Sequence, residues 1–533
     1  MKYPLGVQTF SKLIRQNYVY VDKTALIYKL VDEGEWYFFS RPRRFGKSVL
    51  VSTLEALFRG EKSLFETLFI STTDYAFDEH PVIKLEFTKA KILNATSFEA
   101  FISEQITTLA KQHQIPLTSE RFERQFDQLV TGLHLQTGRK VVLLVDEYDK
   151  PLLNTLETDQ LADVKTSMNA FYGVVKALDE HLRFVFITGV SKFSKVSVFS
   201  GMNNLEDISM RKDYSALCGY TQQELDNYFE QALKSLAATE QKKPATIKIE
   251  VKQWYNGYRF HRNGTTVYNP HSILSLCKNQ EFDNFWFQST TPTFLIERLK
   301  TRQYLLSELD NLYISPEGLN ASEPEHTSIQ SLFVQTGYLT ISSWTGTLYQ
   351  LDFPNREVRD SFYKSIVEHY AYVEKGIGPI YIEQLVKGFK DKNLEHVFAT
   401  LKLFFANIPY DITIDQEKYY QSIFFAIFKL LGFLIEAEVR TNKGRIDCVV
   451  QTETFIYVLE FKLQGTQDDA LQQIKDKQYA QKYQGCGKEI ILLGVEFDRQ
   501  ERNLGTWVEE RHQTGDGPRF ITDDQQGSTS AEN

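Results

Sequence analysis

Several segments in the first 215 residues of this 533-residue chain are apolar without interruption. Val141 to Val145 and Phe184 to Ile187 offer no polar face to water. A strand of this kind must be covered on both faces, which is typical of a parallel sheet with helices between successive strands. Trp36 to Phe39 is a further candidate strand, and the residues after it repeat apolar side chains at helical spacing. The sequence therefore predicts an α/β fold with a parallel sheet here.

A phosphate-binding loop is predicted between that strand and that helix. The segment from Arg41 to Ser48 matches the pattern GxxxxGK[ST], except that Arg41 replaces the first glycine. In such a loop, backbone N–H groups surround the phosphates, the lysine reaches the β and γ oxygens, and the hydroxyl binds Mg²⁺. The residues expected to bind the nucleotide are Arg43, Arg44, Phe45, Gly46, Lys47, Ser48 and Val49.

Two carboxylates follow the apolar strand at 141–145. Open α/β sheets bind ligands at the carboxyl ends of their strands, so we expect Asp146 to hold Mg²⁺ through water and Glu147 to polarise the attacking water. Thr188 ends the next strand and is expected to contact the γ-phosphate, although a threonine there also commonly caps a turn. ATP with Mg²⁺ is the predicted cofactor.

Positive charge is concentrated in the phosphate loop, which contains Arg41, Arg43 and Arg44. Guanidinium groups match phosphate geometry, so these side chains are predicted to brace the nucleotide or to contact nucleic acid or an acidic partner surface. Arg211 is a candidate for an arginine finger donated to a neighbouring subunit, should the protein form a homo-oligomer.

A second group of charged residues lies in the C-terminal region. Asp447 follows the start of one predicted strand, 445–450, and Glu460 and Lys462 stand at the end of the next, 455–461. Glu460 and Lys462 project to the same face because strand residues alternate. Asp447 and Glu460 are expected to hold Mg²⁺, with Mn²⁺ as an alternative, and Lys462 is expected to orient the attacking water or to stabilise the pentavalent phosphate.

A Glu-x-Lys pair alone is also typical of an exposed hairpin. Here apolar residues surround it, and the predicted elements follow the order α-β-β-β-α-β. Glu417 and Glu438 are alternative sources of a third carboxylate, and both are also interpreted as ordinary exposed glutamates. Gln473 and Tyr479 are predicted to orient the metal site or to touch DNA, and the alternative is that they form the edge of an amphipathic helix.

Composition restricts the classes of partner. The net charge of −9 excludes a chain that coats nucleic acid along its whole surface, so a nucleic-acid site must be local. The four cysteines lack CxxC pairing, which argues against a zinc cluster and a disulfide framework. The sequence shows no apolar run of about 18 residues and no signal-peptide pattern, so we expect a cytoplasmic protein without membrane contact.

The chain contains YPLGVQTFSKLI, YVDKT, FFSRPRRFGKS, VDEYDKPL, FITGVSKFSKVSVFSGMNNLEDIS, LCGYTQQEL, WYNGYRF, VYNP, GRIDCVV, YVLEFKL and ALQQI. Together these motifs resemble the bacterial and archaeal family that joins an AAA-ATPase-like domain to a C-terminal PD-(D/E)XK nuclease-superfamily domain. The resemblance implies ATP binding and hydrolysis in the N-terminal part and a DNA-cleaving fold at the end. It implies nuclease roles only for Asp447, Glu460 and Lys462. An arginine in place of the first loop glycine fits the pattern of that family.

The expected organisation has four parts. They are an AAA-like P-loop ATPase domain at 1–215, a mainly helical middle region at 216–355, a restriction-endonuclease-like domain with preceding helices at 356–515, and a disordered tail at 516–533. Within the middle region, Thr221 and Glu224 form a capping-box pair, and residues 255–269 are predicted to form a β-hairpin around Asn263-Gly264.

The leading functional hypothesis is an ATP-regulated, Mg²⁺-dependent DNA endonuclease, with defence against foreign DNA as one biological setting. The alternative is an ATPase switch whose C-terminal domain binds nucleic acid or a partner protein without cleaving it, which the acidic net charge favours. An RNA nuclease differs only in its substrate, so the sequence leaves that reading open.

Overall fold

The computed structural model describes residues 2–512 except 90, 157, 193–197, 200, 287–292, 303, 311, 322–326, 371–376, 408–415, 433–435, 443–444, 463–464, 485, 499 and 502. The side chains of residues 89, 293–294, 370, 416–418, 421, 436–442 and 445–447 are also outside the description. The tail predicted at 516–533 lies outside the described residues. The chain divides into two compact units, residues 1–295 with 309–362 and residues 296–308 with 363–533.

A parallel sheet forms the centre of the first unit, with its strands in the order β2-β3-β4-β1-β5. Every residue of β1 and β3 is buried, which is the burial that continuous apolar runs require. The predicted α/β fold is thereby confirmed. The strands are β1 Trp36–Ser40, β2 Val82–Glu86, β3 Val141–Asp146, β4 Leu182–Gly189 and β5 Glu206–Asp207.

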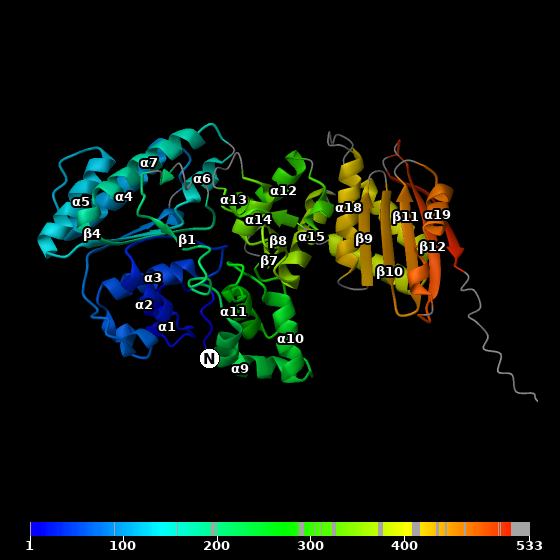
Figure 1. Ribbon diagram of the computed structural model, residues 1–533, viewed down its shortest axis with the longest axis horizontal. Helices are drawn as coiled ribbons and strands as arrows, with labels where there is room; N and C mark the ends of the chain where they lie inside the picture. The colour runs from blue at the N-terminus through cyan, green and yellow to red at the C-terminus, as the bar shows by residue number, and fades with distance from the viewer. Residues whose placement is uncertain are drawn as a thin grey trace, which may run out of the picture. The chain divides into compact units, whose positions relative to one another are not determined.

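Helices cover both faces of this sheet. Figure 1 shows α4, α5 and α7 over one face and α1, α2 and α3 over the other. The helix predicted after β1 begins at Lys47, directly after the phosphate loop. The helices are α1 Phe10–Arg15, α2 Thr24–Glu33, α3 Lys47–Phe58, α4 Ala95–His113, α5 Phe122–Thr137, α6 Lys150–Thr155 and α7 Leu161–Ala177.

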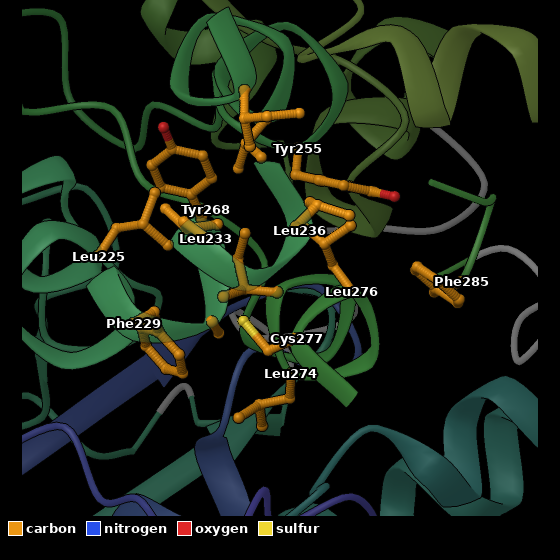
Figure 2. Close-up of a cluster of buried hydrophobic side chains, with 14 of the residues drawn as sticks. Leu225, Phe229, Leu233, Leu236, Tyr255, Tyr268, Leu274, Leu276, Cys277 and Phe285 are labelled. Atoms are coloured by element: carbon orange, nitrogen blue, oxygen red, sulfur yellow. The ribbon is translucent and has the colours of Figure 1, made fainter. Parts of the chain in front are cut away.

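The rest of the first unit is mainly helical and has its own apolar core. The predicted capping box is present, with the Glu224 N–H donating to Thr221 Oγ1 at 3.2 Å. Figure 2 shows apolar side chains of α9, α10 and α11 gathered around Cys277. The helices are α9 Gln222–Thr239, α10 Pro244–Tyr255, α11 Pro270–Asn279, α13 Pro316–Leu319 and α14 Ile329–Thr336, and α12 Thr293–Thr301 and α15 Arg356–Tyr370 extend into the second unit.

The hairpin predicted at 255–269 is smaller than expected. In the described residues it consists of one antiparallel bridge, Tyr258 with Val267. The backbone groups beside the bridge bond to other segments, since the Arg259 N–H donates to Thr340 Oγ1 at 2.7 Å and Tyr268 pairs with Tyr220. An antiparallel sheet that the sequence did not predict lies nearby, with the order β6-β8-β7. Its strands are β6 Leu312–Ile314, β7 Thr340–Trp344 and β8 Tyr349–Asp352.

The second unit contains a five-stranded sheet with the order β13-β12-β11-β10-β9, in which only β11 and β12 run parallel. The predicted order α-β-β-β-α-β is confirmed, and β13 follows it without having been predicted. The elements are α16 Ile377–Lys390, α17 Leu394–Ala406, α18 Gln416–Leu431, β9 Glu436–Asn442, β10 Arg445–Gln451, β11 Phe455–Lys462, α19 Gln467–Asp476, β12 Glu489–Asp498 and β13 Asn503–Arg511.

The two faces of this sheet pack against different helices. Ile456 and Val458 share an apolar cluster with Leu471 and Ile474 of α19. On the other face, the ring of Phe461 lies 4.6 Å from that of Phe424 in α18. Alternation along β11 therefore assigns its even-numbered residues, including Glu460 and Lys462, to the face that α19 covers. Among the residues that the structure describes, no helix combines the length and apolarity needed to cross a bilayer.

Candidate functional site

The phosphate loop presents a row of unused hydrogen-bond donors. Gly46 is the N-cap of α3 and has a φ of 94°, a left-handed conformation that glycine adopts readily. Within the described residues, the backbone N–H groups of residues 43–49 have no acceptor. Free N–H groups at a helix N-terminus attract anions, because the helix dipole places partial positive charge there. The loop can therefore receive phosphate oxygens.

Lys47 is almost completely buried at the start of α3. Its Nζ donates to the carbonyl oxygens of Arg41 at 2.8 Å and Pro42 at 3.1 Å. Burial lowers the pKa of Lys47, and the negative charges of Glu147 and Asp146 oppose this shift. The ammonium group is thus held beside the loop by neutral carbonyls, which a phosphate could replace as stronger partners.

Arg41 does not have the position expected for a nucleotide-bracing residue. Its side chain is 1% exposed, and its guanidinium group donates to backbone carbonyls of the surrounding segments. Arg43 and Arg44, in contrast, line the cavity beside the loop. The prediction that all three arginines act together on phosphates or a partner surface is corrected for Arg41, because its guanidinium group is buried and both of its Nη atoms donate to carbonyls inside the protein.

The two carboxylates after β3 have different surroundings. Asp146 Oδ1 accepts a hydrogen bond from Thr188 Oγ1 at 2.9 Å, so the register of β3 and β4 brings these two predicted site residues together. Glu147 has a φ of 56°, which is uncommon for a residue with a side chain. Burial raises the pKa of Glu147, and the charge of Lys47 opposes the increase. A carboxylate with a raised pKa is suited to accept a proton from water.

Asp149 was not predicted to belong to the site. It is buried and accepts hydrogen bonds at its Oδ2 from the Ser191 N–H and hydroxyl, each at 2.7 Å, and from the Val190 N–H at 3.1 Å. It thereby ties the segment after β3 to the end of β4. The only sequence signal was its place in VDEYDKPL, where an acidic residue is equally typical of an exposed turn.

A cavity of about 440 Å³ adjoins the phosphate loop. The loop residues 43–49 and Glu147 line it, whereas Asp146 and Thr188 are not part of its lining. Residues 4–8, 217–220 and 270–271 also line it. These segments lie far from the loop in sequence. Residues 4–8, 217–220 and 270 fall within the motifs YPLGVQTFSKLI, LCGYTQQEL and VYNP, to which the sequence alone assigns no binding role.

Gly189→Ala is expected to lower the free energy of unfolding by about 1–3 kcal/mol, because overpacking a core forces neighbours to move. An added Cβ would lie 2.6 Å from Cε1 of Tyr148 and 2.8 Å from Oδ1 of Asp149. Gly173→Ala in α7 is the matched control, since a Cβ there meets nothing within 4 Å. Thermal unfolding followed by circular dichroism measures both, and equal melting temperatures for the two variants would contradict the expectation.

A buried carboxylate beside a partly buried lysine forms the second site. Glu460 is 0% exposed, and its Oε1 lies 3.7 Å from Nζ of Lys462. The Lys462 ammonium is also hydrogen-bonded to Gln473 Oε1 of α19. Asp447 is directly opposite Glu460 in the antiparallel register of β10 and β11. The backbone therefore brings together the three residues that the sequence selected.

The structure does not describe the side chains of three predicted site residues, Asp447, Glu417 and Glu438. Of the helix residues left open, Gln473 contacts Lys462, whereas Tyr479 packs against the apolar cluster around Val458. Arg211 pairs with Glu206 and Asp213 of the same chain. Its role as an arginine finger stays a prediction.

Two family models match the sequence. Residues 4–199 match the model described as "Predicted AAA-ATPase", and residues 415–507 match the model described as "PD-(D/E)XK nuclease superfamily". A protein of Azotobacter chroococcum mcd 1 named "Uncharacterized protein in vnfD 5'region" is 38% identical over 526 residues, which cover 96% of this chain and 99% of that protein. A chain of the structure of Drosophila ORC bound to AT-rich DNA and Cdc6 matches with a TM-score of 0.19 and 9% identity, over 65% of this chain and 88% of that chain. A similarity this low carries no weight for the fold.

Proposed function

Because the chain belongs to the family that joins an AAA-ATPase-like domain to a C-terminal PD-(D/E)XK nuclease-superfamily domain, we propose that it hydrolyses ATP and cleaves DNA. The first unit contains the ATPase site and the second unit contains the nuclease site. Cleavage depends on a divalent metal, and ATP regulates its rate. The domain boundaries that we propose are those expected from the sequence, at 215, 355 and 515.

The ATPase proposal is supported by Lys47 and by the backbone N–H groups of residues 43–49, which have no acceptor among the residues that the structure describes. The Ser48 hydroxyl and the Asp146 carboxylate are oxygen ligands of the type that Mg²⁺ prefers, and the ion would supply neutralising charge to the phosphates. Glu147 polarises the attacking water, and its raised pKa favours that role. Thr188 orients Asp146 through their hydrogen bond.

One observation carries the nuclease proposal: the fully buried Glu460 beside Lys462, directly opposite Asp447 on the neighbouring strand. A buried carboxylate is costly unless charges of opposite sign accompany it. Asp447 and Glu460 would hold a Mg²⁺ or Mn²⁺ ion, which supplies a bound water of lowered pKa. Lys462 orients that water or stabilises the charge that grows on the phosphate, and Gln473 fixes the position of the lysine.

A nuclease assay tests this function directly. Purified full-length protein is incubated with supercoiled plasmid, linear duplex, single-stranded DNA and RNA, with and without ATP, in Mg²⁺ or Mn²⁺. We expect the protein to nick DNA and to hydrolyse ATP. EDTA should abolish both activities, because both sites depend on a divalent ion. Protein that hydrolyses ATP but cuts no DNA would contradict cleavage and support a switch that only binds its partner. Cutting restricted to RNA would change the substrate class.

A further inference from the structure

Arg41 occupies the position of the first loop glycine, yet its side chain is buried rather than directed to solvent. Its Nη1 donates to the carbonyl oxygens of Ser40 at 2.9 Å and Ser209 at 2.7 Å. Its Nη2 donates to the carbonyl oxygen of Tyr214 at 3.1 Å. One guanidinium group thus joins the end of β1 to the segment that follows β5. These contacts offset the cost of burying a charge, which is large when the charge lacks polar partners.

Aromatic rings enclose the same guanidinium group. Its Cζ lies 4.3 Å from the ring centre of Phe39 and 3.9 Å from that of Phe260. Phe260 belongs to WYNGYRF, a motif to which the proposed chemistry assigns no role. Phe45 lies inside the phosphate loop, and the centre of its ring is 5.5 Å from that of Phe260 and 4.8 Å from that of Tyr258. The motif therefore packs against both Arg41 and the middle of the loop.

The backbone of Arg41 connects this packing to Lys47. The Arg41 N–H donates to the carbonyl oxygen of Gly189 at 3.1 Å, which fixes the loop to the end of β4. The Arg41 carbonyl accepts from Lys47 Nζ at 2.8 Å. Arg41 therefore has two roles. Its side chain is held by the surrounding protein, and its carbonyl oxygen holds the Nζ of Lys47.

We propose that Arg41, enclosed by Phe39 and Phe260, is a positioning residue that sets the conformation of the phosphate loop and the starting position of Lys47. Other loops of this pattern rely on a glycine at this point, whereas here a buried side chain fixes the backbone from outside the loop. The planar fork of arginine serves several carbonyls at once, which a lysine ammonium on a flexible stem cannot reproduce. The inference rests on the proposed ATP hydrolysis.

Arg41→Lys in the full-length protein tests the proposal. The variant keeps the charge but loses the fork, so we expect the KM for ATP to rise about tenfold, since small displacements of a binding group reduce its contribution steeply. The kcat at saturating ATP should change much less, because Lys47 and Glu147 are intact. Met168→Ala in the buried face of α7 is the control that lowers the melting temperature without touching the loop. Its KM should equal that of the wild type.

Phe260→Leu provides a second variant that keeps every hydrogen bond of the guanidinium group. It should raise the KM by a smaller factor, and it decides the question if Arg41→Lys does not fold. A KM unchanged in the folded Arg41→Lys protein, or raised equally in Met168→Ala, would overturn the positioning role while leaving the proposed ATPase intact. Wild-type protein that neither binds nor hydrolyses ATP would instead overturn the proposed function and this inference with it.

Discussion

Lys462→Ala is expected to reduce DNA cleavage by about 100- to 1,000-fold, the usual effect of removing one group that stabilises a transition state. Lys462 lies 3.7 Å from the buried Glu460 and is held by Gln473, so its charge is fixed in place before substrate arrives. ATP hydrolysis should be unchanged, because the residues proposed for it belong to the other compact unit. Initial nicking rates on plasmid and phosphate release from ATP measure the two activities in one preparation.

Lys475→Ala is the matched control for this experiment. Lys475 lies on the same helix as Gln473, but its side chain is 37% exposed and its Nζ lies 2.6 Å from Oε2 of Glu510. An exposed ion pair contributes at most about 1 kcal/mol, so cleavage and stability should stay near wild type. Cleavage by Lys462→Ala at the wild-type rate would show that the pair is structural.

Stability must be measured alongside, because breaking a buried ion pair can cost about 3–5 kcal/mol. Lys462→Arg separates the two effects. It keeps a positive charge beside Glu460, so it should preserve the melting temperature, but its different shape should still impair cutting. Recovery of stability without recovery of cleavage would assign a chemical role to the lysine.

The sequence predicted the elements of both sites because each depends on local pattern. Continuous apolar runs such as Val141 to Val145 require burial on both faces, and the register of β3 and β4 then brings Asp146 to Thr188 without further information. Alternation along β11 similarly predicted that Glu460 and Lys462 share a face. The hydrogen bond between Lys462 and Gln473 exists because α19 covers that face of the sheet. The helical pattern of α19 alone could not predict which face it would cover.

Other features could not be predicted, because they depend on segments distant in sequence. The direction of the Arg41 side chain is decided by the carbonyls of Ser209 and Tyr214 and by the ring of Phe260. An arginine within a phosphate loop is more naturally read as a phosphate ligand. The short strands of the β6-β8-β7 sheet are also weak signals, since three to five residues carry too little periodicity. These strands form because β6 and β7 pair with β8 in the folded chain.

Lys47→Ala is expected to reduce ATP hydrolysis by about 100-fold or more, because the loop loses the lysine that its pattern assigns to the β and γ oxygens. Removing Lys47 also leaves the carbonyls of Arg41 and Pro42 without this donor, so binding of ATP should weaken as well.

Glu147→Gln should have a different effect from Lys47→Ala. It keeps the loop donors and Lys47, so ATP should still bind while hydrolysis falls by about 10²- to 10⁴-fold, the range for a general base. Fluorescent-nucleotide titration and phosphate release separate the two variants.

The same pair of variants tests whether ATP regulates the nuclease. Coupling between two sites is a free-energy difference between protein states, so a variant that binds ATP without hydrolysing it should hold the protein in one state. Glu147→Gln with ATP should therefore change the nicking rate relative to Glu147→Gln without ATP, whereas Lys47→Ala should not respond to ATP. Metal affinity at Asp447 and Glu460 should be the same in both, because neither substitution lies in that unit. If ATP changes the nicking rate neither in the wild type nor in the two variants, the two sites act independently.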